Sequence, residues 1–420
     1  MTGIPSQQVV KHIVILGGSY GGISTAHYLL KHVIPQLPNS DSYQIVLISA
    51  SAQILCRPAC PRAIISDDLL PQDKLFVSIP HVFENYPAKN FRFEYGTALR
   101  VDHLQRMVTF RSAGDLLDKR ISFHALITAT DASTPSPLLS LNRDSEYLRA
   151  QWAEFRTALP TAKRIVIAGG GPAGIETAGE LGEYLNGRPG WFTWKTKDPL
   201  VRITVVTSSS QILPVLRNGI ASKAEDYLAR VGVEVIKNTK VTGVTPPNAG
   251  TEDALVTKTM VSLTDGRILE ADIYIPATGT SPNTGFLERT LLGSDGRVET
   301  NASTLRVDKA GPRVYAIGDA ASYARPAVHA ILSAVPVLCA NLKRDLLRAS
   351  GRDETYVGDD RVFKEDTRET QLVPIGTSKG VGAVMGYQLP SFLLWLIKGR
   401  DYWLWITENL WSGKQWAKAS

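Results

Sequence analysis

The chain has 420 residues, of which 44% are hydrophobic and 20% are charged. This composition allows large buried cores and excludes global disorder. The formal net charge of +6 favours acidic partners such as dinucleotide phosphates. The sequence contains no dense block of lysine and arginine, so we expect no specific binding of nucleic acid. Three cysteines exclude a disulfide scaffold and fit a reducing compartment. Because we find neither a leader peptide nor a run of ~20 apolar residues, we expect a cytoplasmic protein.

The N-terminal region has the pattern of a βαβ unit, with strands expected at 12–16 and 43–48 and a helix at 23–32. The intervening turn, Gly17-Gly18-Ser19-Tyr20-Gly21-Gly22, matches G-x-G-x-x-G except at Ser19. The outer glycines of such a turn allow a tight bend and close helix packing, and the helix N-terminus binds a diphosphate. Ser49 ends the second strand, where a carboxylate usually binds ribose.

The same pattern returns farther along the chain, with strands expected at 164–168 and 201–206 and a helix at 175–185. Here the turn Gly169-Gly170-Gly171-Pro172-Ala173-Gly174 matches completely. Thr207 and three serines follow the second strand, so no carboxylate stands there to repel the 2′-phosphate of NADP. This favours NADPH, or the use of both nucleotides, with Arg217 as a distant candidate for the phosphate.

Glu176 lies just after the second turn, in what we expect to be the first turn of the helix. One interpretation is a carboxylate that stabilises the helix dipole. The other is a functional group that hydrogen-bonds the nicotinamide carboxamide.

Further short apolar segments predict strands of a small meander and of both main sheets, and Ser133–Pro137 is a candidate linker. The expected strands cover residues 91–95, 107–110, 125–128, 233–236, 259–263, 271–275 and 314–317.

These motifs, in this order, resemble the two-dinucleotide-fold flavoprotein reductases of the pyridine nucleotide-disulfide oxidoreductase class. The resemblance rests on the two glycine turns, on Ala125-Leu-Ile-Thr-Ala-Thr130, and on Ile275-Pro-Ala-Thr-Gly-Thr280 followed by Val314-Tyr-Ala-Ile-Gly-Asp-Ala320. Within the class, the segments 373–382 and 398–401 are similar to the apoptosis-inducing-factor-like group, especially its ferroptosis suppressor protein type.

The resemblance implies an α/β fold with two Rossmann-like domains for FAD and NAD(P), three-layer ββα architecture and a C-terminal α+β segment. We expect the FAD domain at 1–135 and 286–345, the NAD(P) domain at 160–285, and an interface or membrane-contact segment at 346–420.

The resemblance also implies which residues bind cofactors. Arg57 would lie beside the flavin and Asp319 would hold its ribityl chain. Besides Glu176, Thr207 and the two turns, the expected cofactor-binding set includes Ser49, Arg57, Ala98, Thr130, Thr278, Gly279, Asp319 and Ala320. The chain departs from the family pattern at Ser49 and at Asp131, which replaces a glycine, and it lacks the lysine that often follows the Arg57-Pro58 step.

From this we expect FAD and NADPH or NADH as cofactors, a quinone-like or other small organic electron acceptor, and a monomer or homodimer. The alternatives are a tailoring oxidase or reductase of a biosynthetic intermediate and a binding protein on a reductase scaffold. Cys56 and Cys60 are either a redox pair or two buried thiols. The scattered histidines predict no metal site.

Five of the eight tryptophans lie in the tail, at Trp395, Trp403, Trp405, Trp411 and Trp416. With Lys398 and Arg400 beside an apolar segment, this composition fits a membrane surface. The other interpretation is a helix packed on the flavin domain, or a dimer interface.

Overall fold

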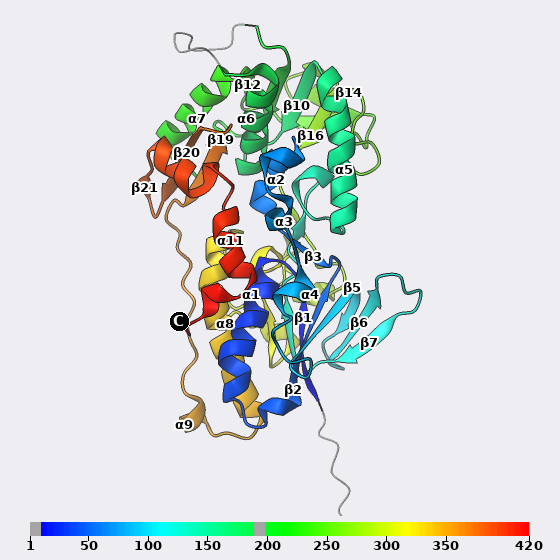
Figure 1. The fold of residues 1–420 in the computed structure, drawn as a ribbon, viewed down its shortest axis with the longest axis vertical. Helices are drawn as coiled ribbons and strands as arrows, with labels where there is room; N and C mark the ends of the chain where they lie inside the picture. The colour runs from blue at the N-terminus through cyan, green and yellow to red at the C-terminus, as the bar shows by residue number, and fades with distance from the viewer. Residues whose placement is uncertain (1–9, 189–197, 420) are drawn as a thin grey trace, which may run out of the picture.

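The computed structural model describes residues 10–188 and 198–419. Two sheet regions are stacked along its long axis (Figure 1). The lower sheet has the order β18-β8-β1-β2-β5-β6-β7. Its strands are β1 (Lys11–Leu16), β2 (Tyr43–Ser49), β5 (Phe91–Asp102), β6 (Met107–Ser112), β7 (Lys119–Ser122), β8 (Ala125–Thr128) and β18 (Val314–Ala316).

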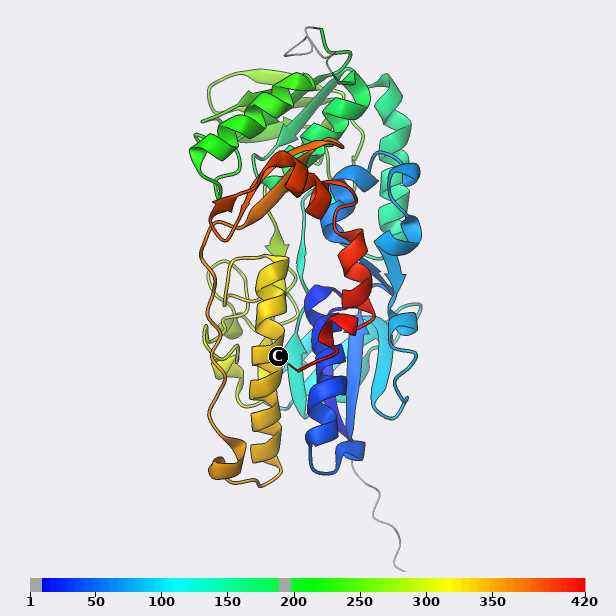
Figure 2. The ribbon, with the colours of Figure 1, turned by 60° about the vertical axis from the view of Figure 1, so that its left-hand side comes forward.

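This sheet is parallel from β18 to β5 and antiparallel from β5 to β7. The helices α1 (Tyr20–Tyr28) and α8 (Val328–Ala349) pack side by side over it (Figure 2). The expected strand at 91–95 therefore extends to Asp102, because its second half pairs with β6. The expected helix at 23–32 begins earlier, at Tyr20, and ends in a π-helical turn, Leu29–Val33.

The upper sheet has the order β12-β11-β10-β16 and is parallel throughout. Its strands are β10 (Arg164–Ala168), β11 (Arg202–Val206), β12 (Val233–Ile236) and β16 (Ile273–Pro276), accompanied by α5 (Ser145–Ala158), α6 (Pro172–Asn186) and α7 (Asn218–Arg230). A small antiparallel sheet adds β13 (Val241–Thr245), β14 (Thr259–Leu263) and β15 (Ile268–Ala271). The predicted α/β fold with two dinucleotide-binding units is confirmed.

The chain segment that leads from β8 up to β10 and the segment that returns from β16 to β18 are hydrogen-bonded to each other. Strand β9 (Ala132–Ser133) pairs antiparallel with β17 (Ser281–Pro282). Asn283 receives a hydrogen bond from Ser133 Oγ at 2.7 Å and donates one to the Thr130 carbonyl at 3.0 Å. The expected linker at Ser133–Pro137 is thus a fastened, partly buried crossing.

Short elements lie between the lower and upper parts (Figure 1). Strands β3 (Gln53–Leu55) and β4 (Phe76–Ser78) pair, and the short helices are α2 (Cys60–Ala63), α3 (Gln72–Leu75) and α4 (Ile79–Val82). One of them, α2, contacts α6.

The C-terminal region forms a sheet of β19 (Gln371–Ile375), β20 (Lys379–Val384) and β21 (Tyr387–Gln388), which contacts α6 and α7. It continues through α10 (Ser391–Leu394), a π-helical turn (Trp395–Gly399) and α11 (Leu404–Trp411). Trp411 and Trp416 are buried in the lower core, whereas Trp395 and Trp405 are exposed. The tail therefore packs on the lower sheet region over part of its length. Among the described residues, no helix combines the length and apolar composition that a membrane crossing needs.

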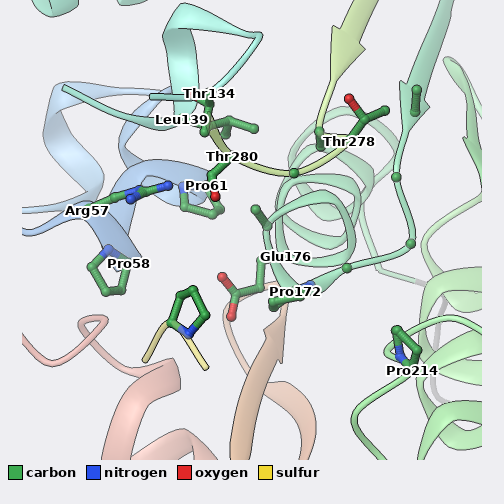
Figure 3. A pocket seen from close by; sticks show the side chains of 18 of the residues that line it. Arg57, Pro58, Pro61, Thr134, Leu139, Pro172, Glu176, Pro214, Thr278 and Thr280 are labelled. Atoms are coloured by element: carbon green, nitrogen blue, oxygen red, sulfur yellow. The ribbon is translucent and has the colours of Figure 1, made fainter. Parts of the chain in front are cut away.

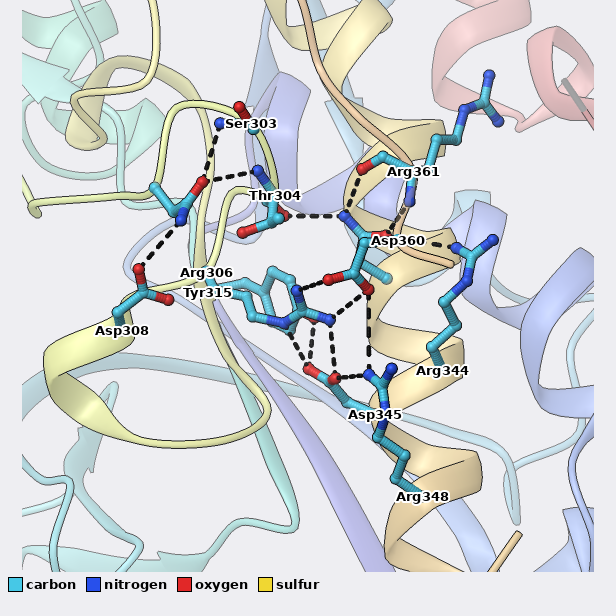
Figure 4. Close-up of polar contacts among 12 residues, drawn as sticks. Ser303, Thr304, Arg306, Asp308, Tyr315, Arg344, Asp345, Arg348, Asp360 and Arg361 are labelled. Carbon is cyan, nitrogen blue, oxygen red and sulfur yellow. Dashed lines mark hydrogen bonds and ion pairs between the residues drawn. The ribbon is translucent and has the colours of Figure 1, made fainter. Parts of the chain in front are cut away.

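An irregular segment, residues 358–370, runs along the molecule from α9 (Glu354–Val357) to β19, and we call it the strap (Figure 2). Its lower end is fixed by Arg306, which binds Asp345 at 2.8 Å and the strap carboxylate Asp360 at 2.9 Å (Figure 4). Tyr315 also donates to Asp345, at 2.6 Å. At the upper end Arg217 pairs with Glu369 at 2.6 Å. The strap is thus held by ion pairs at both ends.

Candidate active site

The first glycine turn makes a cradle at the end of β1. Gly17 has a φ of +108°, and a Cβ there would lie 2.1 Å from the Ala129 carbonyl oxygen. A Cβ at Gly22 would lie 1.8 Å from the Gly17 carbonyl oxygen. No side chain caps α1 at Ser19, so the positive end of the helix is available to a diphosphate.

A cavity of about 340 Å³ opens at this turn. Of the residues expected to bind FAD, it is lined by Gly17, Gly18, Ser19, Ser49, Arg57, Ala98 and Thr130. The residue types and the uncapped helix fit the adenosine and diphosphate half of FAD.

The second turn repeats this geometry at the end of β10. Gly169 has a φ of +131°, and a Cβ there would lie 2.1 Å from the Ala277 carbonyl oxygen. A Cβ at Gly174 would lie 2.2 Å from the Gly169 carbonyl oxygen, whereas Gly171 faces open space. Helix α6 begins at Pro172 without a side-chain cap. This arrangement fits the diphosphate of a nicotinamide nucleotide.

A larger cavity of about 720 Å³, the nicotinamide cavity, lies against this second turn (Figure 3). The expected site residues that line it are Gly169, Gly171, Pro172, Ala173, Glu176, Thr207, Thr278 and Gly279, together with Tyr20, Arg57 and Asp319 from the flavin side. Gly21, Gly22, Gly174 and Ala320 are buried and line neither cavity.

Arg57 and Asp131 line both cavities and so mark where the two meet. Arg57 Nη1 lies 3.0 Å from Asp131 Oδ1 and 3.3 Å from Asp319 Oδ2. Asp131 has a φ of 58°, which the usual glycine would adopt without strain. Burial, with a contribution from the Asp131 charge, raises the pKa of Asp319 to about 6. An additional carboxylate therefore lies where the flavin diphosphate and ribityl chain would be held.

Glu176 and Lys398 form a buried ion pair beside the nicotinamide cavity, with Lys398 Nζ 2.6 Å from Glu176 Oε1. The same ammonium donates to the Leu372 carbonyl at 2.9 Å and lies 4.9 Å from the Trp403 ring centroid. Burial raises the pKa of Glu176 to about 7, although the Lys398 charge opposes the shift. Since α6 begins at Pro172, Glu176 lies in the second turn and not in the expected first turn, so it does not act as a first-turn dipole acid.

One face of α6 holds the C-terminal region through three glutamates. One turn after Glu176, Glu180 binds Arg62 at 2.7 Å and accepts a hydrogen bond from the Tyr402 hydroxyl at 2.9 Å. Glu183 accepts one from Thr377 Oγ1 at 2.6 Å. Together these contacts of α6 with the C-terminal region place Lys398 in the cavity wall. Sequence reasoning did not single out Lys398 as a site residue. Its signal was the charged motif at 398–401.

At the adenosine end of the nicotinamide cavity, Thr207 lies with Ser208, Ser209 and Lys240. The exposed Lys240 ammonium has no hydrogen-bond or ion-pair partner among the described residues. Arg217, the distant candidate for this position, is instead bound to Glu369. Lys240, which sequence reasoning also did not single out, is therefore the candidate for this position.

The three cysteines are free and buried. Burial raises the pKa of Cys56 to about 11 and that of Cys60 to about 12. Because the thiolate is the reactive form, these values favour two buried thiols over a redox pair. The described residues contain no cluster of His, Cys, Asp or Glu suited to a metal ion.

Comparison with known proteins agrees with this geometry. Residues 11–334 match the family model described as pyridine nucleotide-disulphide oxidoreductase. The chain belongs to this family. It is therefore an FAD-dependent NAD(P)H oxidoreductase, as the sequence motifs predicted.

Several known proteins align with this chain over nearly its whole length. Oxidoreductase phnG of Penicillium herquei is 63% identical over 98% of both chains. The human ferroptosis suppressor protein 1 is 24% identical over 93% of both chains. The solved structure of NDH2 from Plasmodium falciparum in complex with NADH has a TM-score of 0.64 at 13% identity, covering 98% of this chain and 99% of that one. The last likeness shows the shared fold.

Replacing Asp131 tests how its charge affects FAD binding. We expect Asp131→Gly to bind FAD roughly tenfold more tightly, which is about 1.4 kcal/mol, because a carboxylate next to the diphosphate is removed. Titration of the apoprotein with FAD, followed by flavin fluorescence, measures the dissociation constant.

Asp131→Asn is the matched control, since asparagine also tolerates positive φ and keeps the side-chain size. It should reproduce most of the gain. Equal FAD affinity in all three proteins would contradict the electrostatic explanation.

Proposed function

We propose that the protein passes reducing equivalents from NAD(P)H, by way of FAD, to a quinone-like or other small organic acceptor. The observation that carries the proposal is the meeting of the two cavities at Arg57 and Asp131, each cavity beginning at an uncapped helix N-terminus. When bound, FAD would supply the two-electron chemistry that links a hydride donor to the acceptor. The net reaction consumes NAD(P)H, one proton and the oxidised acceptor, and yields NAD(P)⁺ and the reduced acceptor.

The protein's own groups have binding and orienting roles in this proposal. The turn at 169–174 would hold the nucleotide diphosphate, and the Glu176 carboxylate would accept a hydrogen bond from the nicotinamide carboxamide. Lys398 fixes that carboxylate at 2.6 Å, in a buried wall that excludes water. Arg57 and Asp319 would hold the flavin.

A second candidate is the tailoring oxidation or reduction of a biosynthetic intermediate. It is supported by the much higher identity to the Penicillium oxidoreductase than to ferroptosis suppressor protein 1. Both candidates use the same site and differ in the acceptor.

The exposed part of the tail supports contact with an apolar surface such as a membrane as part of the proposal. Phe392, Trp395, Leu396 and Trp405 are exposed on the segment from α10 to α11. Tryptophan and leucine side chains of this kind bind at lipid interfaces.

The test of the main proposal is anaerobic. The FAD-loaded protein should lose its yellow colour on addition of NADPH or NADH, and a panel of quinones and other carbonyl acceptors should restore it. A protein that binds no flavin after reconstitution, or whose flavin neither nucleotide reduces, would refute the proposal.

Glu176 predicts a pH dependence of nucleotide binding. The carboxylate is the form that accepts the carboxamide hydrogen bond, and its pKa is raised to about 7. The KM for NADPH should therefore fall by up to roughly tenfold between about pH 6 and about pH 8, as the group ionises. Glu176→Gln should have a high KM that does not change over this range, and a wild-type-like profile in that variant would contradict the role.

Lys240 predicts nucleotide preference. Lys240→Glu should raise the KM for NADPH roughly tenfold, about 1.4 kcal/mol, and leave that for NADH nearly unchanged, because only NADPH carries the 2′-phosphate. The control is Lys237→Glu, an exposed lysine that pairs with Glu225 and does not line the cavity. Equal effects on both nucleotides would argue against a phosphate contact.

A further inference from the structure

A third cavity, of about 530 Å³, lies between the N-terminal part of α8, the strap and residues 403–415. We call it the strap chamber. Its walls carry large apolar side chains, among them Leu332, Phe363, Leu372, Trp403, Ile406 and Leu410. The volume and the apolar lining are typical of a small-molecule site.

The strap chamber shares a wall with the nicotinamide cavity. Tyr20, Val328, Lys398 and Trp403 line both spaces. The remaining part of that cavity reaches Arg57 and Asp319, the residues that fit the flavin. Pro172, from the turn at 169–174, lines both spaces as well. A ligand in the chamber would thus lie next to the redox region and touch the nucleotide turn only at its edge.

The polar groups of the chamber indicate the charge of its ligand. Arg325 pairs with Glu365, and Arg368 pairs with Asp366, so these four charges balance. The Lys364 ammonium has no hydrogen-bond or ion-pair partner in the described part of the chain.

Two further polar side chains, His329 and Gln371, line the chamber. Burial lowers the pKa of His329, which makes its ring a neutral hydrogen-bonding group at neutral pH. Gln371 lines the chamber with its side-chain oxygen buried and without a partner in the described residues, a state that is unfavourable unless a ligand donor satisfies it.

We propose that the strap chamber binds the electron acceptor and selects a planar aromatic quinone that carries an anionic oxygen. The aromatic faces of Trp403 and Phe363 suit a flat ring system, Lys364 suits the anion, and Gln371 suits a ligand hydroxyl. This inference rests on the proposed function and names its acceptor class. In the reduction, NAD(P)H supplies two electrons and one proton, solvent supplies the second proton, and the two quinone carbonyls become hydroxyls.

The chamber is preformed, because the strap that walls it is tied at Asp360 and at Glu369. A preformed site loses little free energy to ordering when a ligand binds.

The test measures binding to the oxidised, FAD-loaded protein by calorimetry. The probes are a hydroxynaphthoquinone that is anionic at neutral pH and its neutral methyl ether. The wild type should bind the anionic probe at least about tenfold more tightly. Lys364→Ala should remove that preference, whereas Lys379→Ala, an exposed lysine on β20 outside the chamber, should keep it.

A second pair of variants tests the place of binding. Ser333 is exposed on α8 and lines the chamber, so Ser333→Trp should fill it and weaken both probes more than about tenfold. Ala349→Trp, exposed near the end of the same helix and outside the chamber, should bind like the wild type. Retained FAD shows that each variant is folded.

Unchanged probe binding in Ser333→Trp would overturn the chamber assignment, and unchanged preference in Lys364→Ala would overturn the anion selection. Both results leave the proposed function standing if NAD(P)H still bleaches the flavin. Failure of that bleaching in the wild type would instead refute the proposed function.

Discussion

The contact between the acidic face of α6 and the C-terminal region holds the whole site together. Helix α6 presents an uncapped N-terminus that fits a diphosphate and, one turn apart, Glu176 and Glu180. Glu180 is bound to Arg62 at 2.7 Å in a buried pair, and breaking such a pair costs about 3–5 kcal/mol. Because the N-terminal end of this helix fits a diphosphate and its acidic face binds the tail, a single rigid element sets the position of Lys398 relative to the second glycine turn.

Much of the fold was predictable because its signal is local. A β-branched strand, a glycine turn and a helix follow one another twice within short stretches, and each turn needs its glycines for close backbone approach, as Gly17 and Gly169 show. The family landmarks fixed the order of the elements, and the structure brings Arg57 and Asp319 within 3.3 Å across a long sequence separation.

The remaining features depend on contacts that sequence does not encode locally. Helix α8 was not predicted: its buried residues repeat with a helical period, but Pro336 lies inside it, and a proline in a sequence usually predicts the end of a helix. Lys240 belongs to no motif, and the motif at 398–401 does not say where Lys398 lies, so only folding brings the two side chains to the cavity. The strap has no periodic pattern, since its course is set by ion pairs at Asp360 and Glu369. The sequence of the tail also does not indicate which tryptophans are buried: Trp411 is buried, whereas Trp405 is exposed.

The pairing of β9 with β17, fastened by Asn283, has a consequence for how the enzyme works. Two chain crossings that hydrogen-bond to each other resist a hinge rotation more than two separate strands would. This pairing therefore opposes a change in the spacing between the upper and lower sheets.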